Sequence, residues 1–262
     1  MKLAVSNIAW TTEYDENMYE FLKEEHIDGL EIAPTRIFLQ APYEQLKEAT
    51  DYARQLYEKY SLAIPSMQSI WFGRSENIFA SSQERQILLD YTKKAIDFAQ
   101  VIGCGNLVFG CPRNRAYVQG CDTSLAISFF EELGEYALSK NTVLSMEANP
   151  PIYNTNYCNT TQEALELVKT VGSKGFLINL DLGTMIHNGE DMHVVDAARD
   201  YLNHIHISEP GLALPKQREL HRELARYLKE TAYDKYVSME TKTQEDIDCV
   251  KETMHYLQDV FA

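Results

Sequence analysis

Short apolar runs alternate with amphipathic helical stretches eight times along the 262 residues of this chain. The strand candidates read KLAVSNIA, GLEIAP, LAIPSMQS, GNLVFGCP, TVLSMEANP, FLINLDLG, NHIHISEP and KYVSMET. Polar caps, such as Ser81 with Glu84, open the helical stretches, and glycines such as Gly103 close them. Eight β-then-α units predict an α/β fold, a (β/α)8 TIM barrel with residues 1–262 as a single domain. A doubly wound sheet would carry a glycine-rich turn after its first strand, which SNIAWTTEYDE lacks.

The charge balance argues against two classes of partner. Lys and Arg total 24 against 39 Asp and Glu, so the formal net charge is -15. A surface this acidic repels phosphate backbones and anionic lipids, so we expect neither nucleic acid nor membrane as a partner. The N-terminus does not resemble a signal peptide, and the five cysteines are an odd number without CxxC spacing. We therefore expect a cytoplasmic protein with reduced thiols.

Polar side chains share one face of each of the last four strand candidates. These inward pairs are Ser145 and Glu147, Asn179 and Asp181, His204 and His206, and Ser238 and Glu240. The last member of each pair lies near the carboxyl end of its strand, where barrel enzymes build their sites. Three carboxylates and one imidazole that converge there would repel one another strongly unless a cation bound among them.

A single divalent metal ion is the simplest occupant of this set, with Glu147, Asp181, His206 and Glu240 as ligands. Because the set is rich in oxygen, Mn²⁺ is the first choice, and Mg²⁺, Co²⁺ or Zn²⁺ remain alternatives. Two coordination positions would stay open for a chelating substrate. A buried histidine bonded to a neighbouring carboxylate is the simpler alternative for His206, and His204 is expected one layer deeper, bonded to Asn179 or another inward polar group.

These residues resemble the xylose isomerase-like barrel superfamily, which includes ketose 3-epimerases, hydroxypyruvate isomerase, inosose dehydratase and endonuclease IV. The resemblance covers essentially the whole chain, and HISE is similar to the strand-seven signature of the epimerases. It implies that Glu147 and Glu240 both hold the metal and move protons on opposite faces of the substrate. It also implies possible homodimers or homotetramers.

The sequence departs from the ketose epimerase pattern around the expected substrate. Thr184 stands where the epimerases carry a histidine, and His187 is the nearest replacement. Tyr153 stands where a second carboxylate is common, and Pro210-Gly211-Leu212 where an arginine is expected. The metal site thus resembles that of the family, while the substrate side differs.

Further candidates for substrate binding lie at other strand ends, each with a simpler structural alternative. Glu31 is a substrate-binding acid or a salt-bridge partner, and Trp71 is part of a lid or a packing anchor. Arg113 and Arg115 bind an anionic substrate group or are ordinary surface residues, and Glu209 reaches the substrate or caps the next segment. The remaining candidates are Gln68 and His187.

The sequence predicts a metal-dependent isomerase or epimerase of a ketose or related polyhydroxy carbonyl compound. The expected mechanism is a metal-stabilised enediolate with glutamate acid/base catalysis. A metal-dependent dehydratase (lyase) of an inosose or keto acid is the alternative. An endonuclease IV-like DNA repair hydrolase would need histidines near Gln68 and Gly110, and a non-catalytic sugar-binding barrel would not need the ligand set.

Overall fold

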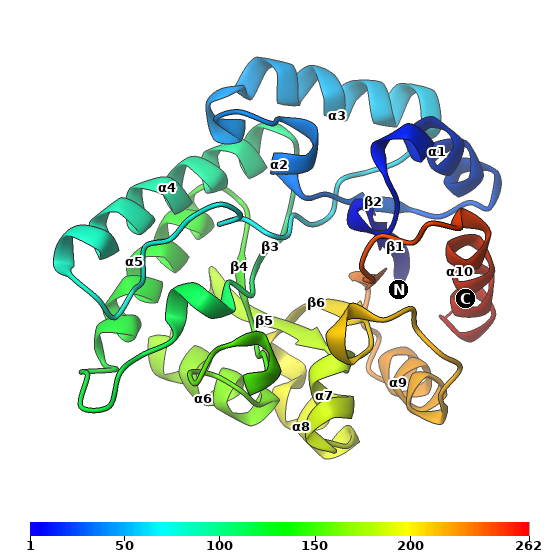
Figure 1. Ribbon diagram of the computed structural model, residues 1–262. Helices are drawn as coiled ribbons and strands as arrows, with labels where there is room; N and C mark the ends of the chain where they lie inside the picture. The colour runs from blue at the N-terminus through cyan, green and yellow to red at the C-terminus, as the bar shows by residue number, and fades with distance from the viewer. Residues whose placement is uncertain (262) are drawn as a thin grey trace.

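A closed ring of parallel strands lies inside a ring of helices, as Figure 1 shows for the computed structural model, which describes residues 1–261. The strands are β1 (Lys2–Ser6), β2 (Gly29–Glu31), β3 (Leu107–Phe109), β4 (Leu144–Glu147), β5 (Phe176–Asp181), β6 (Leu202–Ile207) and β7 (Tyr236–Met239). Their order in the sheet is β2-β1-β7-β6-β5-β4-β3, and every pair is parallel. The chain passes around the ring once from its first unit to its last, and the predicted TIM barrel is confirmed.

The third predicted strand is the exception, because LAIPSMQS forms isolated bridges in place of a regular strand. Ala63 bridges to Gly29 of β2, and Met67 bridges both to Ile32, directly after β2, and to Leu107 of β3. The Met67 amide donates to the carbonyl of Asn106 at 2.9 Å, and its own carbonyl accepts from Val108 at 2.8 Å. Pro65 lies between the bridges and has no amide hydrogen, so it interrupts the ladder. The prediction of a regular strand here was wrong, yet this segment still closes the barrel between β2 and β3.

The helices follow the strands on the outside of the ring. The α-helices are α1 (Asp15–Glu24), α2 (Pro34–Ile37), α3 (Leu46–Tyr60), α4 (Ser82–Val101), α5 (Leu125–Ser139), α6 (Thr161–Val171), α7 (Leu182–Asn188), α8 (Met192–Ala198), α9 (Glu219–Glu230) and α10 (Ile247–Phe261). Short 3-10 helices are η1 (Asn7–Ala9), η2 (Thr12–Tyr14), η3 (Pro42–Glu44), η4 (Pro112–Arg115), η5 (Pro151–Tyr153), η6 (Arg199–Tyr201) and η7 (Pro210–Leu212).

Local sequence signals explain where the helices begin and end. The Ser81 hydroxyl caps α4 by accepting from the Glu84 amide at 3.1 Å, as predicted. At α6, Thr160 and Glu163 form a reciprocal capping box, and Gly172 ends the helix with a φ of 70°. These caps fix the βα loops at the face of the barrel where the inward polar side chains end.

Strand alternation sorts the barrel into an apolar outer face and a polar inner face. Ile178, Leu180, Ile205 and Ile207 are buried in the apolar core beneath the helices. The eight inward polar side chains predicted for β4 to β7 and the residue after β7 are also buried. Buried polar groups need partners, and those partners define the site described below.

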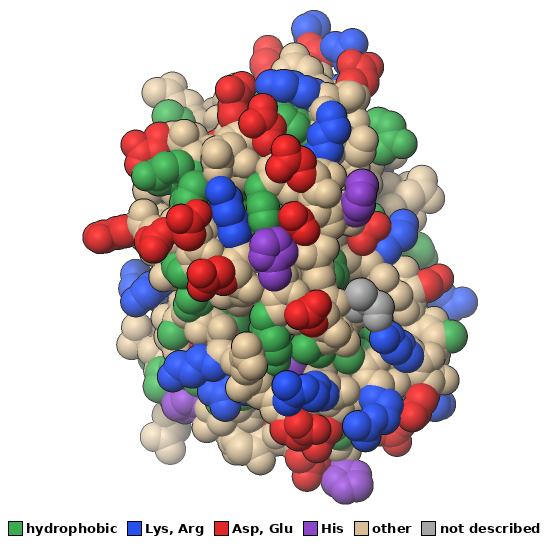
Figure 2. All heavy atoms as spheres, turned by 90° about the vertical axis from the view of Figure 1, so that its right-hand side faces the viewer, with side chains coloured by type: hydrophobic (Ala, Val, Ile, Leu, Met, Phe, Trp, Pro, Cys, Tyr) green, Lys and Arg blue, Asp and Glu red, His purple; other side chains and the backbone are tan. Residues whose placement is uncertain are grey.

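The outer surface mixes charges of both signs. Figure 2 shows acidic side chains interspersed with lysines and arginines on the face that carries α10. Among the described residues, no helix is long and apolar enough to cross a membrane.

Candidate metal centre

Four inward side chains meet at the carboxyl end of the barrel. Each of Glu147, Asp181, His206 and Glu240 offers one possible ligand atom, and these atoms all lie within 4.8 Å of one another. The parallel ladders account for this convergence, because Asp181 is paired with His206, and His206 in turn with Ser238, two residues before Glu240. His206 is fully buried, and the three carboxylates are between 6% and 8% exposed.

The His206 ring has one nitrogen fixed by the protein and the other directed at the carboxylates. Its Nε2 lies 3.0 Å from Oε2 of Glu31, a fully buried carboxylate contributed by β2. Its Nδ1 lies 3.0 Å from Oε1 of Glu147 and 3.1 Å from Oε2 of Glu240, yet it has no well-directed hydrogen bond. If Nε2 donates to Glu31, Nδ1 keeps its lone pair for a metal ion.

His204 lies one layer deeper, as predicted, and shares the Glu31 carboxylate. Its Nε2 lies 3.2 Å from Oε2 of Glu31 and 2.8 Å from Oγ of Ser238. Its partners are thus Glu31 and Ser238, whereas Asn179 donates to Oε1 of Glu147 at 2.8 Å. Glu31 therefore supports the two histidines and does not line the cavity, so the salt-bridge alternative describes its position.

The carboxylates are held by donors from neighbouring strands and loops. The Asn149 amide donates to Oε2 of Glu147 at 3.0 Å. Asp181 accepts from the Thr184 backbone amide at 2.6 Å and from the Ser208 hydroxyl. Oriented carboxylates of this kind lose little side-chain entropy when they bind an ion.

The charges of the cluster do not balance within the protein. Burial, followed by repulsion from Glu147, raises the pKa of Asp181 to about 6. Burial likewise raises the pKa of Glu240 to about 7, with Glu147 and Asp181 adding to the effect. Burial opposes a charge on His206, but Glu31 and Glu240 outweigh it and hold the pKa of that imidazole well above its usual range. Three buried carboxylates in such surroundings indicate a missing positive charge.

A divalent cation fits this set of donors. Three carboxylates and the free Nδ1 of one imidazole suit Mn²⁺, Mg²⁺ or Co²⁺ better than they suit Zn²⁺, which favours nitrogen and sulfur ligands. The cluster could therefore hold one metal ion, with Glu147, Asp181, His206 and Glu240 as its ligands.

A cavity of about 170 Å³ opens onto the three carboxylates. Its other lining residues are Gln68, Ser69, Val108, Gly110, Cys111, Pro112, Asn149, Tyr153 and Leu212. Gly110 leaves room for Glu147, because a Cβ atom at this position would lie 2.8 Å from Oε2 of Glu147 and would force that carboxylate to shift. Gln68 and Gly110, the positions where the resemblance to endonuclease IV leads us to expect histidines, both line this cavity.

Other predicted substrate residues lie away from this cavity. Trp71 is 2% exposed, donates to Oγ1 of Thr92 at 2.8 Å and packs edge-on against Phe109, so it is a packing anchor. His187 and Arg113 are exposed and do not belong to the lining. Glu209 is buried and forms an ion pair with Arg218, which occupies both of its carboxylate oxygens.

Arg115 was considered for anion binding but is fully buried, and it supports the site from behind. Its guanidinium donates to the Glu147 carbonyl at 2.9 Å and to Oδ1 of Asn149 at 2.6 Å.

Sequence reasoning missed Asn149, Ser208 and the role of Tyr153 in the lining. Asn149 is the second residue after the end of β4, and this position is the signal that could have identified it.

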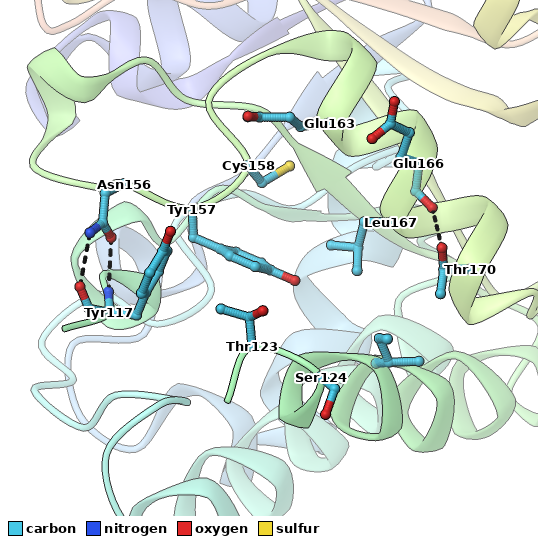
Figure 3. Close-up of a pocket in the computed structure, with 11 residues that line it drawn as sticks. Tyr117, Thr123, Ser124, Asn156, Tyr157, Cys158, Glu163, Glu166, Leu167 and Thr170 are labelled. Atoms are coloured by element: carbon cyan, nitrogen blue, oxygen red, sulfur yellow. Dashed lines mark hydrogen bonds between the residues drawn. The ribbon is translucent and has the colours of Figure 1, made fainter. Parts of the chain in front are cut away.

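A larger cavity, of about 380 Å³, lies beside α5 and α6, outside the barrel axis (Figure 3). Tyr117, Tyr157 and Cys158 line it, and Asn156 exchanges two hydrogen bonds with the backbone of Tyr117. Among the described residues, no cluster of possible metal ligands falls in this cavity. Three members of the possible ligand cluster line the smaller cavity, so the smaller cavity is the candidate site.

Solved structures share this architecture at low sequence identity. D-psicose 3-epimerase from Clostridium cellulolyticum H10 aligns over 100% of this chain and 99% of its own, with a TM-score of 0.81 and 15% identity. The 3-keto-D-glucoside 4-epimerase of E. coli aligns over 99% of both chains, with a TM-score of 0.78 and 18% identity. A probable 3-DHS dehydratase from Bacillus anthracis aligns over 98% of this chain and 99% of its own, with a TM-score of 0.70 and 17% identity.

At these identities the similarity establishes the fold and not the reaction. A comparison with curated proteins found no match. The profile of the xylose isomerase-like TIM barrel family matches residues 19–260, which is nearly the whole chain. The chain therefore belongs to the xylose isomerase-like TIM barrel family.

Proposed function

We propose that the protein is a divalent-metal-dependent sugar isomerase or epimerase. One observation carries the proposal: Glu147 and Glu240 approach the same nitrogen of His206 from different strands and line one small cavity together with Asp181. Two carboxylates on either side of a bound substrate are what a proton transfer between its two faces requires. The substrate would be a ketose or a related polyhydroxy carbonyl compound.

In this mechanism Glu147 removes the proton from the carbon next to the carbonyl, and an enediolate forms. Glu240, which must be protonated at the start, then donates its proton to the opposite face. This inverts that carbon and leaves Glu147 protonated and Glu240 ionised, and exchange with solvent restores both. Asn149 and Asn179 orient Glu147 through hydrogen bonds of 3.0 and 2.8 Å to its two oxygens. A bound divalent cation would polarise the carbonyl and its neighbouring hydroxyl, which acidifies the C–H bond.

A dehydratase would share the first proton transfer and then expel a β-hydroxyl group. This alternative is retained because a probable dehydratase is among the structural neighbours. No residue of the described cavity distinguishes the two, so the reaction product decides between them. A dehydratase would generate a conjugated enone with a new ultraviolet absorbance, whereas an epimerase would not.

The test is solvent exchange in deuterated water with the Mn²⁺-loaded protein. We expect deuterium to enter the carbon next to the carbonyl in at least one member of a panel of ketoses, inososes and keto acids. Glu147→Gln and Glu240→Gln should each reduce exchange by at least about 10²-fold, as expected for loss of a general acid or base. Glu209→Gln is the matched control, because Glu209 is an equally buried carboxylate outside the cavity. A metal-loaded protein that exchanges no substrate would overturn the proposal.

The remaining parts of the proposal follow the sequence expectations. We propose Mn²⁺ as the metal, residues 1–262 as one catalytic domain, and a cytoplasmic enzyme whose five cysteines are free thiols. Homodimers or homotetramers are proposed from the family resemblance alone. Size-exclusion chromatography with light scattering and metal analysis of the purified protein test these statements.

A further inference from the structure

One wall of the metal cavity is formed by Tyr153 and Leu212, which belong to the loops after β4 and β6. The Tyr153 hydroxyl accepts a hydrogen bond from the Gly211 amide at 2.8 Å. The two loops are therefore joined across the edge of the cavity. Both are places where the sequence departs from the ketose epimerase pattern, and the structure brings the two departures into contact.

Leu212 is held in a conformation that leucine rarely adopts. Its φ is 53°, in the left-handed region, which is strained for a residue with a Cβ. Its carbonyl accepts from the Lys242 amide at 2.9 Å and from the Thr241 hydroxyl at 3.1 Å, directly after Glu240. These hydrogen bonds join the loop after β6 to the segment that follows Glu240, one of the proposed ligands. They hold Leu212 in its place in the cavity lining.

No described residue that lines the cavity is a lysine or an arginine. The charged lining residues are the three carboxylates of the metal cluster, whose combined charge already exceeds that of one divalent cation. Arg115 is committed to the Glu147 carbonyl and Asn149, and Arg218 is paired with Glu209. A phosphate or carboxylate on the substrate would find no positive partner in this lining and would be repelled by the acids.

We infer that Tyr153 and Leu212 determine specificity for an uncharged substrate with a deoxygenated end, that is, a methyl or methylene carbon beside the wall. This rests on the proposed function and names the substrate class of the same site. Ser69 and Asn149 belong to the same lining, and the Ser69 oxygen and the second hydrogen of the Asn149 side-chain amide remain for substrate hydroxyls. A hydroxyl buried against the Leu212 side chain would lose its water without gaining a partner from that side chain.

Binding to the Mn²⁺-loaded protein tests this inference separately from catalysis. The probes are D-fructose, its 1-deoxy and 6-deoxy analogues, and fructose 1- and 6-phosphates, compared by calorimetry. We expect one deoxy analogue to bind on the order of tenfold to a hundredfold more tightly than D-fructose, and neither phosphate to bind detectably. Equal or tighter binding of D-fructose or of a phosphate overturns the inference, as does failure to bind either deoxy analogue.

Substitutions test whether Tyr153 and Leu212 cause the preference for the deoxy analogue. Leu212→Asn places a polar side chain in the cavity, and asparagine tolerates the left-handed region, so the loop should keep its course. We expect this variant to lose most of the preference for the deoxy analogue, and Tyr153→Phe to weaken it by freeing Gly211. Leu214→Asn, on the same loop but outside the lining, should keep it. An unchanged preference in Leu212→Asn overturns the assignment.

Deuterium exchange with the same compounds separates the two proposals. Preferential binding of a deoxy analogue without exchange in any substrate would overturn the proposed function and leave the specificity inference standing. Exchange that favours D-fructose or a phosphate would support the function and overturn the inference. Arg113→Ala adds a check, because the exposed Arg113 is the remaining guanidinium on the loop after β3, and its loss should not change binding of the deoxy analogue.

Discussion

Replacing Glu31 by Gln removes the carboxylate that orients His206 but leaves all four proposed metal ligands in place. Glu31 is fully buried, and its Oε2 lies 3.0 Å from Nε2 of His206 and 3.2 Å from Nε2 of His204. Both histidine contacts depend on this one oxygen. An uncharged amide oxygen in its place accepts weaker hydrogen bonds than a carboxylate oxygen does, and an NH₂ group in its place cannot accept from either ring. The consequence is a less well oriented His206 and a weaker electron donor at Nδ1.

Loss of such a supporting carboxylate lowers metal affinity by about 10- to 100-fold, or about 1.4–2.7 kcal/mol. Free Mn²⁺ counted by electron paramagnetic resonance gives this affinity without any assay of activity. Glu209→Gln serves as the control, because Glu209 is also buried but pairs with Arg218 and does not touch His206. If Glu31→Gln is folded and binds Mn²⁺ within about threefold of the unaltered protein, the supporting role of Glu31 is refuted.

Three further changes probe the site and its scaffold. Gly110→Ala should weaken Mn²⁺ binding by about tenfold, because the new Cβ would lie 2.8 Å from a Glu147 oxygen; Gly105→Ala, with open space around it, should have no effect in the same titration. Mn²⁺ at about 1,000 times its Kd should stabilise the protein by about 4 kcal/mol in thermal unfolding, and Asp181→Asn should abolish most of that gain. Burial lowers the pKa of His221 to about 4, so the unfolded chain binds the extra proton and stability falls as the pH drops from about 6.5 toward 4. Denaturant unfolding at pH 7 and 4.5 should show that His221→Leu removes about 2–3 kcal/mol of this acid sensitivity, and an unchanged slope would contradict the assignment.

The second half of the barrel could be predicted from the sequence because period-two alternation sets which side chains point inward. Asp181 ends β5 and His206 is the penultimate residue of β6, and the two strands pair in register from Asn179 to Asp181, beyond an irregularity at Ile178. The direction of both side chains therefore follows from strand alternation. The same reasoning predicted a regular third strand and was wrong there. The run is apolar and suggests an extended chain, but Pro65 interrupts the pairing and leaves isolated bridges.

Contacts across the barrel could not be predicted in this way. Glu31 was a candidate for the substrate because it ends a strand, yet it lies against His206, which is 175 residues away in sequence. Trp71 and Glu209 look like site residues from their position after a strand, but Trp71 turns into the core and Glu209 turns toward Arg218. Local periodicity gives the direction of a side chain on a strand, whereas a loop side chain is placed by packing that only the folded chain supplies.

The metal centre and the substrate wall are built on parts of the fold with different constraints. The ligands of β4, β5 and β6 sit on strands paired on both sides, so displacing any one of them disturbs two ladders. The wall depends on loop contacts: the Tyr153 hydroxyl with Gly211, and the Leu212 carbonyl with Lys242 and Thr241. Changing Leu212 should therefore cost the barrel little, whereas changing Asp181 would remove one of the proposed metal ligands. Substrate preference can thus change in this fold through the loops after β4 and β6 while the ligand set and its proton transfer stay fixed.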